Sequence, residues 1–478
     1  MQLKSAGYDG LVITGTSRTP CYLIINNETI AVHSAEALWG LDTLTTREKL
    51  TAEHGSDVET LCIGPAGEKL IRFSVAVAAK GSAVAHGFGA VMGSKQLKAI
   101  AVRGSGKVAV AYPDRLKELN RSIRRMVKGR ILMDPMIGGI ELVRRTPCRG
   151  CPAGCSRGVY RHISGSEEYR KNCASAYFYY DCERDHNNGN PGEQSFLATS
   201  LCDRLGLCTQ ELGKLLNWLN TCFGQSLITE DSSGLQWSQL GTPDFFKSFA
   251  DMLISRKGLG DILAEGVIRS AHALGKPAVE LLDGVVEGSG FSADLYNGRY
   301  FLTNAVLHAT DRINPMISLH EIVYPLFKWV LWYATDGSMS QVSTKAFLEI
   351  ARKFWINEQA VDFSTYEGKG AVAAHIQNRE YAKETLVACD FFYPIVTPEG
   401  TDDHVGDPSI ESRLLAAVTG LECSEQDYYR IGERVFNLQR IIAVREGHRG
   451  RRDDILPEFN FSEPLEVDRI YFGMFNPE

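Results

Sequence analysis

The sequence predicts an α+β fold, in which a small β-rich segment is followed by one or two mostly helical domains. The chain has 478 residues, which is too long for a single hydrophobic core. Short β-branched and apolar runs bounded by Gly, Pro or Asn occur before about residue 108, at 10–15, 21–25 and 97–102. From about Pro113 onward, apolar residues recur with helical spacing instead.

The helical part can be divided into individual elements. Helical spacing predicts helices over 114–128, 210–222, 243–255, 345–354 and 424–444. Asp114 is the expected N-cap of the first helix, and Ser424 with Asp427 forms a capping-box pattern before the last. The last helix has an apolar stripe that we expect to pack in a core: Tyr428, Ile431, Val435, Leu438 and Ile442.

Composition excludes some classes of function. The formal net charge of -7 argues against a nucleic-acid partner, because such proteins usually present an excess of Lys and Arg. The residues after Met1 do not form a signal peptide. The longest apolar stretch, 322–333, is shorter than the about 20 residues that span a bilayer, so we expect a buried helix there. The sequence therefore predicts a cytoplasmic protein without a membrane span.

Cysteine spacing is the most informative local feature. Without an export signal, clustered cysteines indicate a metal site rather than disulfides. Cys148, Cys151 and Cys155 are spaced Cys-x2-Cys-x3-Cys and can ligate three corners of a [4Fe–4S] cluster. Cys389 is the leading candidate for the fourth ligand. Zinc and inert buried thiols stay open as alternatives, although a zinc site would usually add a second closely spaced pair.

Together with this cysteine pattern, several other blocks resemble the aldehyde ferredoxin oxidoreductase family. They are Gly-Pro-Ala-Gly-Glu at 64–68 with Arg72-Phe73, the glycine-rich block 87–95 followed by 97–100, Asp-x-x-Gly-Leu at 203–207, and the C-terminal segments 444–447 and 453–457. The matches run from residue 7 to residue 465. Taken together they are far more specific than any one of them.

The resemblance implies a tungsten or molybdenum ion held by two pterins beside the [4Fe–4S] cluster. It implies a partial β-rich, pterin-binding N-terminal domain (1–108) and two mostly helical domains. The first (109–290) contains the cluster cysteines and the first pterin motif, and the second (291–478) contains the fourth cluster ligand. Relative to the family, we expect the first part of the N-terminal domain to be missing.

The resemblance also implies a two-electron reaction on a small molecule. The expected reaction interconverts an aldehyde and a carboxylic acid, with ferredoxin as electron carrier. Cys208 occupies a position where aldehyde-oxidising members often have Asp, and its soft thiolate could bind tungsten directly. This cysteine and Leu319-His-Glu321 resemble the catalytic subunit of tungsten-dependent benzoyl-CoA reductases, which implies reduction of an aromatic acyl-CoA with further electron-transfer subunits. A homodimer or larger complex is expected.

The glycine-rich block is an expected pterin-phosphate site. Its spacing, Gly-x-Gly-x-x-x-Gly, differs from the dinucleotide fingerprint, and a strand follows it instead of a helix. Backbone amides around Gly87 and Gly89 could bind a phosphate, assisted by Ser94 and Lys95. A plain turn without a ligand is the alternative.

Two further segments are expected to contact the pterins. Asp203, Gly206 and Leu207 lie before the helix that begins near residue 209, where the carboxylate could accept hydrogen bonds from pterin; a helix cap is the alternative. The second copy of this motif is altered to Glu384-Thr-Leu-Val-Ala-Cys389, which retains an acid and the cysteine. Arg445, in the Arg-Glu-Gly turn after the last helix, could also face the site; a C-cap is the alternative.

Candidate proton donors are His186, His308 and His320, because histidine titrates near neutral pH. We favour His320, while His186 has the surroundings of a solvated loop and His308 those of a buried hydrogen-bonded residue. Two other functions stay open: an iron–sulfur electron-transfer subunit that has lost the pterin site, and a zinc-stabilised helical scaffold. Pterin content distinguishes the first from an enzyme, and iron content distinguishes the second.

Overall fold

The computed structural model describes residues 2–462 except 79–81, 129–138, 149, 153–156, 164, 166–167, 172, 191, 288–297 and 312–315. Contacts divide the chain into two units. The first combines Met1–Val108, Met133–Gly150 and Gly154–Leu282, and the second combines Ala109–Leu132, Cys151–Ala153 and Asp283–Glu478. The division of the helical part into two domains near residue 290 stays a prediction.

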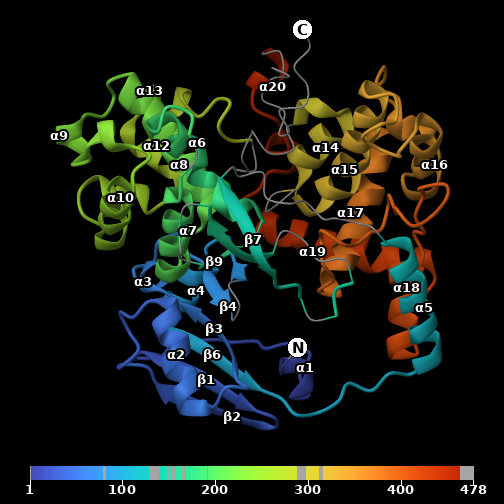
Figure 1. Ribbon diagram of the computed structural model, residues 1–478, viewed down its shortest axis with the longest axis horizontal. Coiled ribbons are helices and arrows are strands. Elements are labelled where there is room, and N and C mark those ends of the chain that lie inside the picture. The colour runs from blue at the N-terminus through green and yellow to red at the C-terminus, as the bar shows by residue number, and fades with distance from the viewer. Residues whose placement is uncertain are drawn as a thin grey trace. The chain divides into compact units, whose positions relative to one another are not determined.

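The first unit is built on a six-stranded mixed sheet (Figure 1). Its strands, in the order β2-β1-β6-β3-β4-β5, are β2 (Thr29–Ser34), β1 (Cys21–Asn26), β6 (Leu97–Arg103), β3 (Glu59–Ile63), β4 (Ala76–Ala78) and β5 (Ala83–Val84). Only β1 and β6 are parallel; the other four pairs are antiparallel. A second, antiparallel sheet joins β7 (Ile140–Arg145), β8 (Gly158–His162) and β9 (Glu168–Lys171).

Side-chain alternation gives the six-stranded sheet two apolar faces. Tyr22 packs with Leu50 of helix α2 (Thr43–His54) on one face. Its neighbour Cys21 packs on the other face with Met92 of α4 (Phe88–Ser94). The remaining helices of this unit are α1 (Gln2–Ser5), α3 (Pro65–Glu68), α6 (Tyr180–His186), α7 (Gln194–Leu205), α8 (Thr209–Gly224), α9 (Glu230–Ser233), α10 (Pro243–Ser255), α11 (Leu259–Leu263), α12 (Val267–Leu274) and α13 (Lys276–Glu280).

The second unit is helical in its described part. Its helices are α5 (Pro113–Met126), α14 (Leu302–Thr310), α15 (Met316–Ala334), α16 (Thr344–Phe354), α17 (Lys369–Thr385), α18 (Ile410–Thr419), α19 (Glu425–Arg445) and α20 (Phe459–Ser462). Its largest hydrophobic cluster joins α14, α15, α16 and α17 around Ile350, Phe354 and Trp355. Among the described helices, none is both long and apolar enough to cross a membrane.

Most predicted elements are confirmed. The runs at 21–25 and 97–102 are β1 and β6, and the five predicted helices are α5, α8, α10, α16 and α19 within two residues at each end. The capping box of Ser424 and Asp427 is present, with both reciprocal hydrogen bonds. Residues 322–333 are helical within α15, and its first part is buried.

Three local predictions are wrong. Residues 10–15 form no strand. Pro113 takes the first position of α5, so Tyr112 and not Asp114 is the N-cap. The apolar stripe of α19 is only partly a core stripe, because Tyr428 is buried but Leu438 and Ile442 are exposed. Helical spacing identifies one face of a helix but does not show how far along the helix its neighbours extend.

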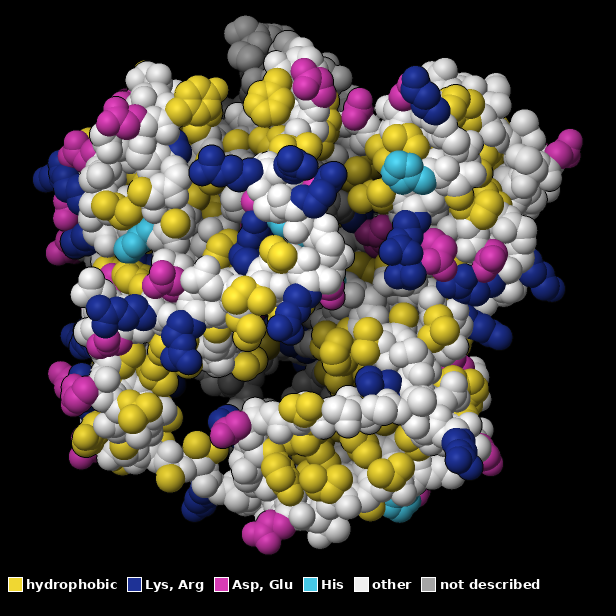
Figure 2. Space-filling model, turned by 180° about the vertical axis from the view of Figure 1, so that it is seen from behind, with side chains coloured by type: hydrophobic (Ala, Val, Ile, Leu, Met, Phe, Trp, Pro, Cys, Tyr) yellow, Lys and Arg dark blue, Asp and Glu magenta, His cyan; other side chains and the backbone are white. Residues whose placement is uncertain are grey.

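Exposed apolar side chains also occur on the first unit. Val12 and two residues of the edge strand β2, Ile30 and Val32, are exposed. Figure 2 shows hydrophobic side chains gathered over the lower part of one face of the molecule, where Figure 1 places the six-stranded sheet.

Candidate cofactor-binding site

Close backbone contacts bring the glycine-rich block against the segment 67–75 of the first unit. The block is not the loop expected from its sequence: residues 88–94 form the short helix α4, capped by Gly87 with φ +78°. A Cβ atom on Gly89 would lie 2.8 Å from the carbonyl oxygen of Val75. A Cβ atom on Gly93 would overlap the carbonyl oxygen of Gly67. The glycines therefore allow α4 to lie directly on the backbone, and β6 follows it as predicted.

The Asp203–Cys208 motif is joined to the same segment. Gly206 ends α7 in the left-handed conformation, with φ +78°. The amide of Val75 donates to the carbonyl of Gly206 at 2.8 Å, and Leu207 forms a β-bridge with Ser74. The amide of Cys208 donates to the carbonyl of Phe73 at 3.2 Å. The glycine-rich block and the Asp203–Cys208 motif, which are far apart in sequence, thus both contact residues 73–75.

Asp203 lies in the last turn of α7 and does not cap the following helix, whose N-cap is Cys208. The hydroxyl of Thr43 donates to the Asp203 carbonyl at 2.7 Å, and Arg204 pairs with Asp42 at 2.7 Å. These contacts connect the start of α2 with the end of α7. The Asp203 side chain is half-buried beside this junction.

Ser74 is an unusual residue in this region. Its side chain is fully buried, and its hydroxyl has no hydrogen-bond partner within the described part of the chain. A buried polar group without a partner costs free energy unless a ligand or water satisfies it. A polar group of a bound pterin would suit this position, so the cradle formed by residues 73–75 and 206–208 fits that cofactor.

A buried ion pair joins α3, at the start of the segment 67–75, to β6. Glu68, in the Gly-Pro-Ala-Gly-Glu segment, forms an ion pair with Lys98, whose side chain is fully buried. The amide of Gly40 donates to Glu68 at 2.8 Å, and Lys98 also donates to the Leu41 carbonyl at 2.7 Å. Burial lowers the pKa of Lys98, while Glu68 acts in the opposite direction.

Helix α7 is anchored at its other end by Glu183. This buried carboxylate accepts hydrogen bonds from the amides of Gln194 and Ser195, both at 3.1 Å, and from the Ser195 hydroxyl. It thereby satisfies donors in the first turn of the helix. Its neighbour His186, an expected loop residue, ends helix α6 and is exposed.

Cys208 is the N-cap residue of α8, so its thiol lies at a helix N-terminus. Burial raises the pKa of its thiol, and the amide groups of Glu211 and Gln210 at the start of α8 act in the opposite direction. The side chain is half-buried next to the cradle. A soft donor in this position suits a tungsten or molybdenum ion.

The expected cluster cysteines are only partly described. Cys155 lies outside the described residues, and those residues contain no group of three or more His, Cys, Asp or Glu arranged to hold a metal. Cys148 is exposed, and its sulfur lies 3.3 Å from Nη1 of Arg157. In the second unit, Cys151 and Cys389 both act on the phenol of Tyr393: burial raises its pKa, and Glu411 and these two thiols raise it further. The thiols of Cys151 and Cys389 are ligands that iron accepts.

The backbone before Cys389 repeats the geometry before Cys208. Val387 follows α17 with φ +54°, a conformation that is strained for a β-branched residue. It stands where the Asp-x-x-Gly-Leu motif has glycine, two residues before the cysteine, as Gly206 does. The carbonyl of Cys389 accepts from the amides of Phe392 at 3.0 Å and Tyr393 at 2.8 Å.

Asp390 connects this cysteine segment to two helices. One carboxylate oxygen lies 2.5 Å from Nδ1 of His320, and the other lies 2.5 Å from Nζ of Lys383. Burial acts to raise the pKa of Asp390, but His320 and Lys383 lower it below its usual value. The His320 ring also packs on Phe391, with ring centres 4.8 Å apart.

More buried charges extend this cluster. Lys383 pairs with Glu380, and both side chains are fully buried. Glu321 accepts a hydrogen bond from Trp355 at 3.1 Å and lies 3.5 Å from the guanidinium of Arg379. Burial raises the pKa of both Glu321 and Glu380, although Arg379 and Lys383 oppose it. Burial likewise raises the pKa of Glu411 to about 7.

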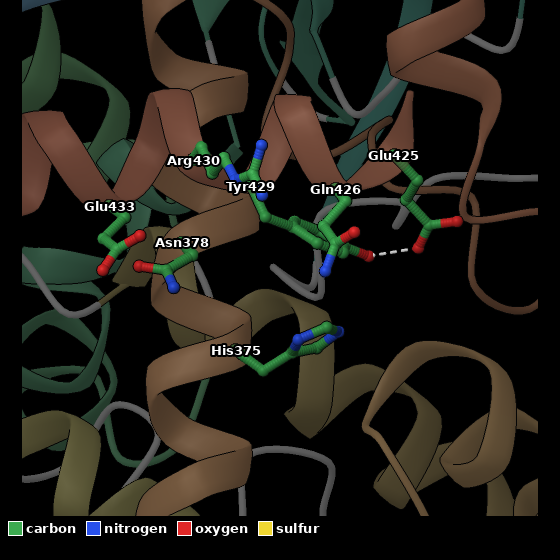
Figure 3. A pocket seen from close by; sticks show the side chains of 7 residues that line it. All are labelled: His375, Asn378, Glu425, Gln426, Tyr429, Arg430 and Glu433. Atoms are coloured by element: carbon green, nitrogen blue, oxygen red, sulfur yellow. Dashed lines mark hydrogen bonds between the residues drawn. The ribbon is translucent and has the colours of Figure 1, made fainter. Parts of the chain in front are cut away.

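Arg379 links this cluster to a surface cavity of about 460 Å³ (Figure 3). Its guanidinium bonds the hydroxyl of Tyr429, which donates to Glu425 at 2.5 Å, the contact dashed in Figure 3. Burial and Arg379 lower the pKa of His375 to about 4. The cavity lies between α17 and α19, and its lining residues are His375, Asn378, Glu425, Gln426, Tyr429, Arg430 and Glu433. None of the residues predicted for the cofactor site lines it.

The other predicted site residues have these positions. The Ser94 hydroxyl donates to Val91 at 2.8 Å, and Lys95 donates to the Gly15 carbonyl at 3.0 Å. Glu384 is exposed in the last turn of α17, and Arg445 is the exposed last residue of α19. His308 is buried in α14. Their roles in cofactor binding stay predictions.

Sequence reasoning missed Lys383, Asp390, Glu380 and Arg379. Three of them lie in α17 with the spacing of a charged, solvent-facing stripe, which is what such residues usually form. The only available signal was the position of Asp390 directly after Cys389.

Comparisons with known proteins identify the family of the chain. The family model described as "Aldehyde ferredoxin oxidoreductase, domains 2 & 3" matches residues 137–470, and that of the N-terminal domain matches residues 1–104. The chain belongs to the aldehyde ferredoxin oxidoreductase family. It is therefore an oxidoreductase related to tungsten-containing enzymes of that name.

Among the relatives in this family, the tungsten-containing aldehyde ferredoxin oxidoreductase of Pyrococcus furiosus is 27% identical, over 97% of this chain and 76% of the relative. The enzyme of Thermococcus kodakarensis is 26% identical with the same coverage. The WOR-like subunit of an aliphatic sulfonate oxidoreductase from Pyrococcus furiosus is 25% identical over 57% of this chain and 51% of that protein. The fold is also that of a chain in the active-site complex BamBC of benzoyl coenzyme A reductase with 1,5-dienoyl-CoA, at a TM-score of 0.74, 19% identity, and coverage of 97% of this chain and 77% of that one.

Proposed function

We propose that this oxidoreductase holds a tungsten or molybdenum ion with two pterins beside a [4Fe–4S] cluster. The proposed reaction interconverts an aldehyde and a carboxylic acid, and ferredoxin carries the electrons. The observation that supports it best is the meeting of Gly206–Cys208 with Phe73–Val75 around the unpartnered hydroxyl of Ser74. The metal–pterin group, when bound, supplies the two-electron chemistry.

The residues of the cradle would bind and orient the cofactor. Ser74 would supply a hydrogen bond to a polar atom of the pterin, and Asp203 would accept hydrogen bonds from pterin amino groups. Gly206 lets the segments of the cradle approach closely, since a Cβ atom there would lie 3.1 Å from both the Gly64 nitrogen and the Val75 carbonyl oxygen. Lys98 and Glu68 hold the supporting strand and helix in place, so the cradle is preformed.

His320 is the proposed proton donor or acceptor. Asp390 contacts its Nδ1, which orients the ring. The ring is buried and packs on Phe391, so bulk water has little access to it. Cys148, Cys151, Cys155 and Cys389 are the proposed cluster ligands, and the cluster would pass single electrons to a carrier.

A second candidate reaction is reduction of an aromatic acyl-CoA. Cys208 favours it, because the half-buried thiol at the start of α8 could bind the metal where aldehyde-oxidising members have a carboxylate. This reaction would need further electron-transfer subunits in place of ferredoxin. A cytoplasmic location and a homodimer or larger complex are part of either proposal.

Elemental analysis of anaerobically purified protein tests the cofactor content. About four Fe and about one W or Mo per chain are expected for the stoichiometry of one cluster and one pterin-bound metal. Iron without W or Mo would overturn the proposal in favour of an electron-transfer subunit, and zinc without iron would favour a scaffold. Activity with aldehydes and with an aromatic acyl-CoA, each with a low-potential dye, then separates the two reactions.

A further inference from the structure

The segment that contains Cys389 is clamped by Lys383. This side chain is fully buried, and its ammonium group contacts two carboxylates, Glu380 and Asp390. Lys383 is thus held by an acid one turn earlier in its own helix and by the residue next to Cys389. A buried ammonium group needs partners that compensate for its lost hydration, so this position is strongly determined.

Each oxygen of the Asp390 carboxylate contacts a different side chain. Lys383 of α17 holds one at 2.5 Å, and His320 of α15 holds the other at 2.5 Å. Two helices therefore determine where Asp390 lies, and with it the adjacent Cys389. This clamp also opposes the strain at Val387, whose φ of +54° would otherwise favour a different path of the chain.

Within the clamp, Lys383 contributes one positive charge close to Cys389, and the carboxylates of Glu380 and Asp390 oppose it. Asp390 directly follows Cys389, a proposed cluster ligand, and the Lys383 ammonium group lies 2.5 Å from the Asp390 carboxylate. Reduction of a [4Fe–4S] cluster adds one negative charge, and nearby buried cations favour the more negative state. The charge of Lys383 would therefore favour the reduced cluster.

We infer that Lys383 is a positioning residue for the iron–sulfur cluster, which holds Asp390 and Cys389 in place and favours the reduced state of the cluster through its buried charge. The inference rests on the proposed function. It assigns to Lys383 a role that is separate from binding the metal or the substrate.

The experiment compares Lys383→Met with Lys369→Met in the anaerobically purified full chain. Lys369 is a matched control, since it is also a buried lysine of α17 but donates to the carbonyls of Gln359, Ala360 and Asp362. The measurements are iron content, and the midpoint potential of the cluster from a redox titration followed by electron paramagnetic resonance. Lys383→Met is expected to shift the potential to more negative values or to lose iron while its circular dichroism is unchanged. Lys369→Met and Lys383→Arg are expected to keep the wild-type values.

Other outcomes have distinct meanings. Lys383→Met with full iron content and the wild-type potential would overturn the inference, and so would equal shifts in both methionine variants. If Lys383→Met does not fold, Asp390→Asn removes the clamp from its other side; a folded Asp390→Asn protein with unchanged iron content and resonance spectrum would overturn the inference. Wild-type protein that binds no iron would instead refute the proposed function.

Discussion

At the scale of single residues, glycine is required where two backbone segments approach too closely for a side chain. Gly93 lies in α4 directly on the carbonyl of Gly67, and any Cβ atom would overlap that oxygen. Gly224, in α8, has no atom within 4 Å of the same position. Both are helical glycines of the first unit, but Gly93 is buried in this contact whereas Gly224 is exposed at the end of α8.

Gly93→Ala is expected to destabilise the protein by about 2 kcal/mol or more, because α4 must move away from the segment 67–75. Gly224→Ala is the control and is expected to be neutral or to stabilise by up to about 1 kcal/mol through helix propensity. Urea unfolding followed by circular dichroism measures both. Equal effects in the two variants would contradict the role of close packing.

Val387 is a residue whose conformation disagrees with its type. Its φ is +54° and its side chain is 91% exposed, so little packing is lost when the side chain is removed. Val387→Gly is therefore expected to raise the free energy of unfolding by about 1 kcal/mol, since glycine adopts this conformation without strain.

The control is Val444→Gly, which removes another exposed valine, in the last turns of α19. It is expected to destabilise by up to about 1 kcal/mol because helical glycine is unfavourable. Thermal unfolding of both variants gives the comparison. A lower stability of Val387→Gly than of the wild type would show that the turn is not strained.

At the scale of elements, single buried acids connect helices to one another. Asp311, which follows α14, accepts hydrogen bonds from Gln377 at 3.0 Å and Tyr381 at 3.3 Å, both in α17. Burial raises its pKa to about 7, from an ordinary value of 3.8. Between pH 3.8 and about 7, Asp311 is therefore protonated in the folded protein but ionised in the unfolded chain.

This linkage gives a pH dependence of known sign. Because the folded state is favoured by the protonated acid, the contribution of Asp311 is fully present below pH 3.8 and is lost as the pH rises through about 7. Asp311→Asn should remove a slope of about 1.4 kcal/mol per pH unit within that window. Unfolding free energies at several pH values measure it. Parallel pH profiles for variant and wild type would show that Asp311 does not titrate in this window.

Helix α7 depends on an acid at its first turn. Glu183 satisfies two amide groups and one hydroxyl there, and the far end of the helix leads to the cradle. Glu183→Ala is expected to destabilise by about 2 kcal/mol, because buried donors lose their partner. The exposed neighbour in Asp185→Asn is the control and should change stability by less than about 0.5 kcal/mol. Urea unfolding of the two variants decides whether α7 needs this acid.

At the scale of the whole molecule, each unit contains its own hydrophobic core and three of the six tryptophans. Phe249 is fully buried in the first unit, and Ile350 is fully buried in the second. We expect two transitions in urea unfolding of cofactor-free protein. Phe249→Ala should shift one of them and Ile350→Ala the other, each by about 3 kcal/mol. A single transition that both variants shift equally would show one cooperative unit.

The sequence by itself determined the class of the protein and several of its longer helices. The predicted helices lie where apolar spacing indicates, and the last one begins at its capping box of Ser424; both signals are local properties. The resemblance of separate blocks to one family is likewise readable without coordinates, and the family models confirm it. The glycine-rich block was recognised for the same reason, although its local structure was predicted wrongly.

Only the tertiary structure decided which residues meet. The contact of Leu207 with Ser74 and that of Asp390 with His320 each join segments far apart in sequence. The charged residues of α17 are buried although their spacing is that of an exposed face, because acids and bases from other segments compensate for one another inside the second unit. Spacing along the chain records which residues share a face of an element. The packing of that face, and therefore the chemistry of the site, depends on elements that the local sequence does not contain.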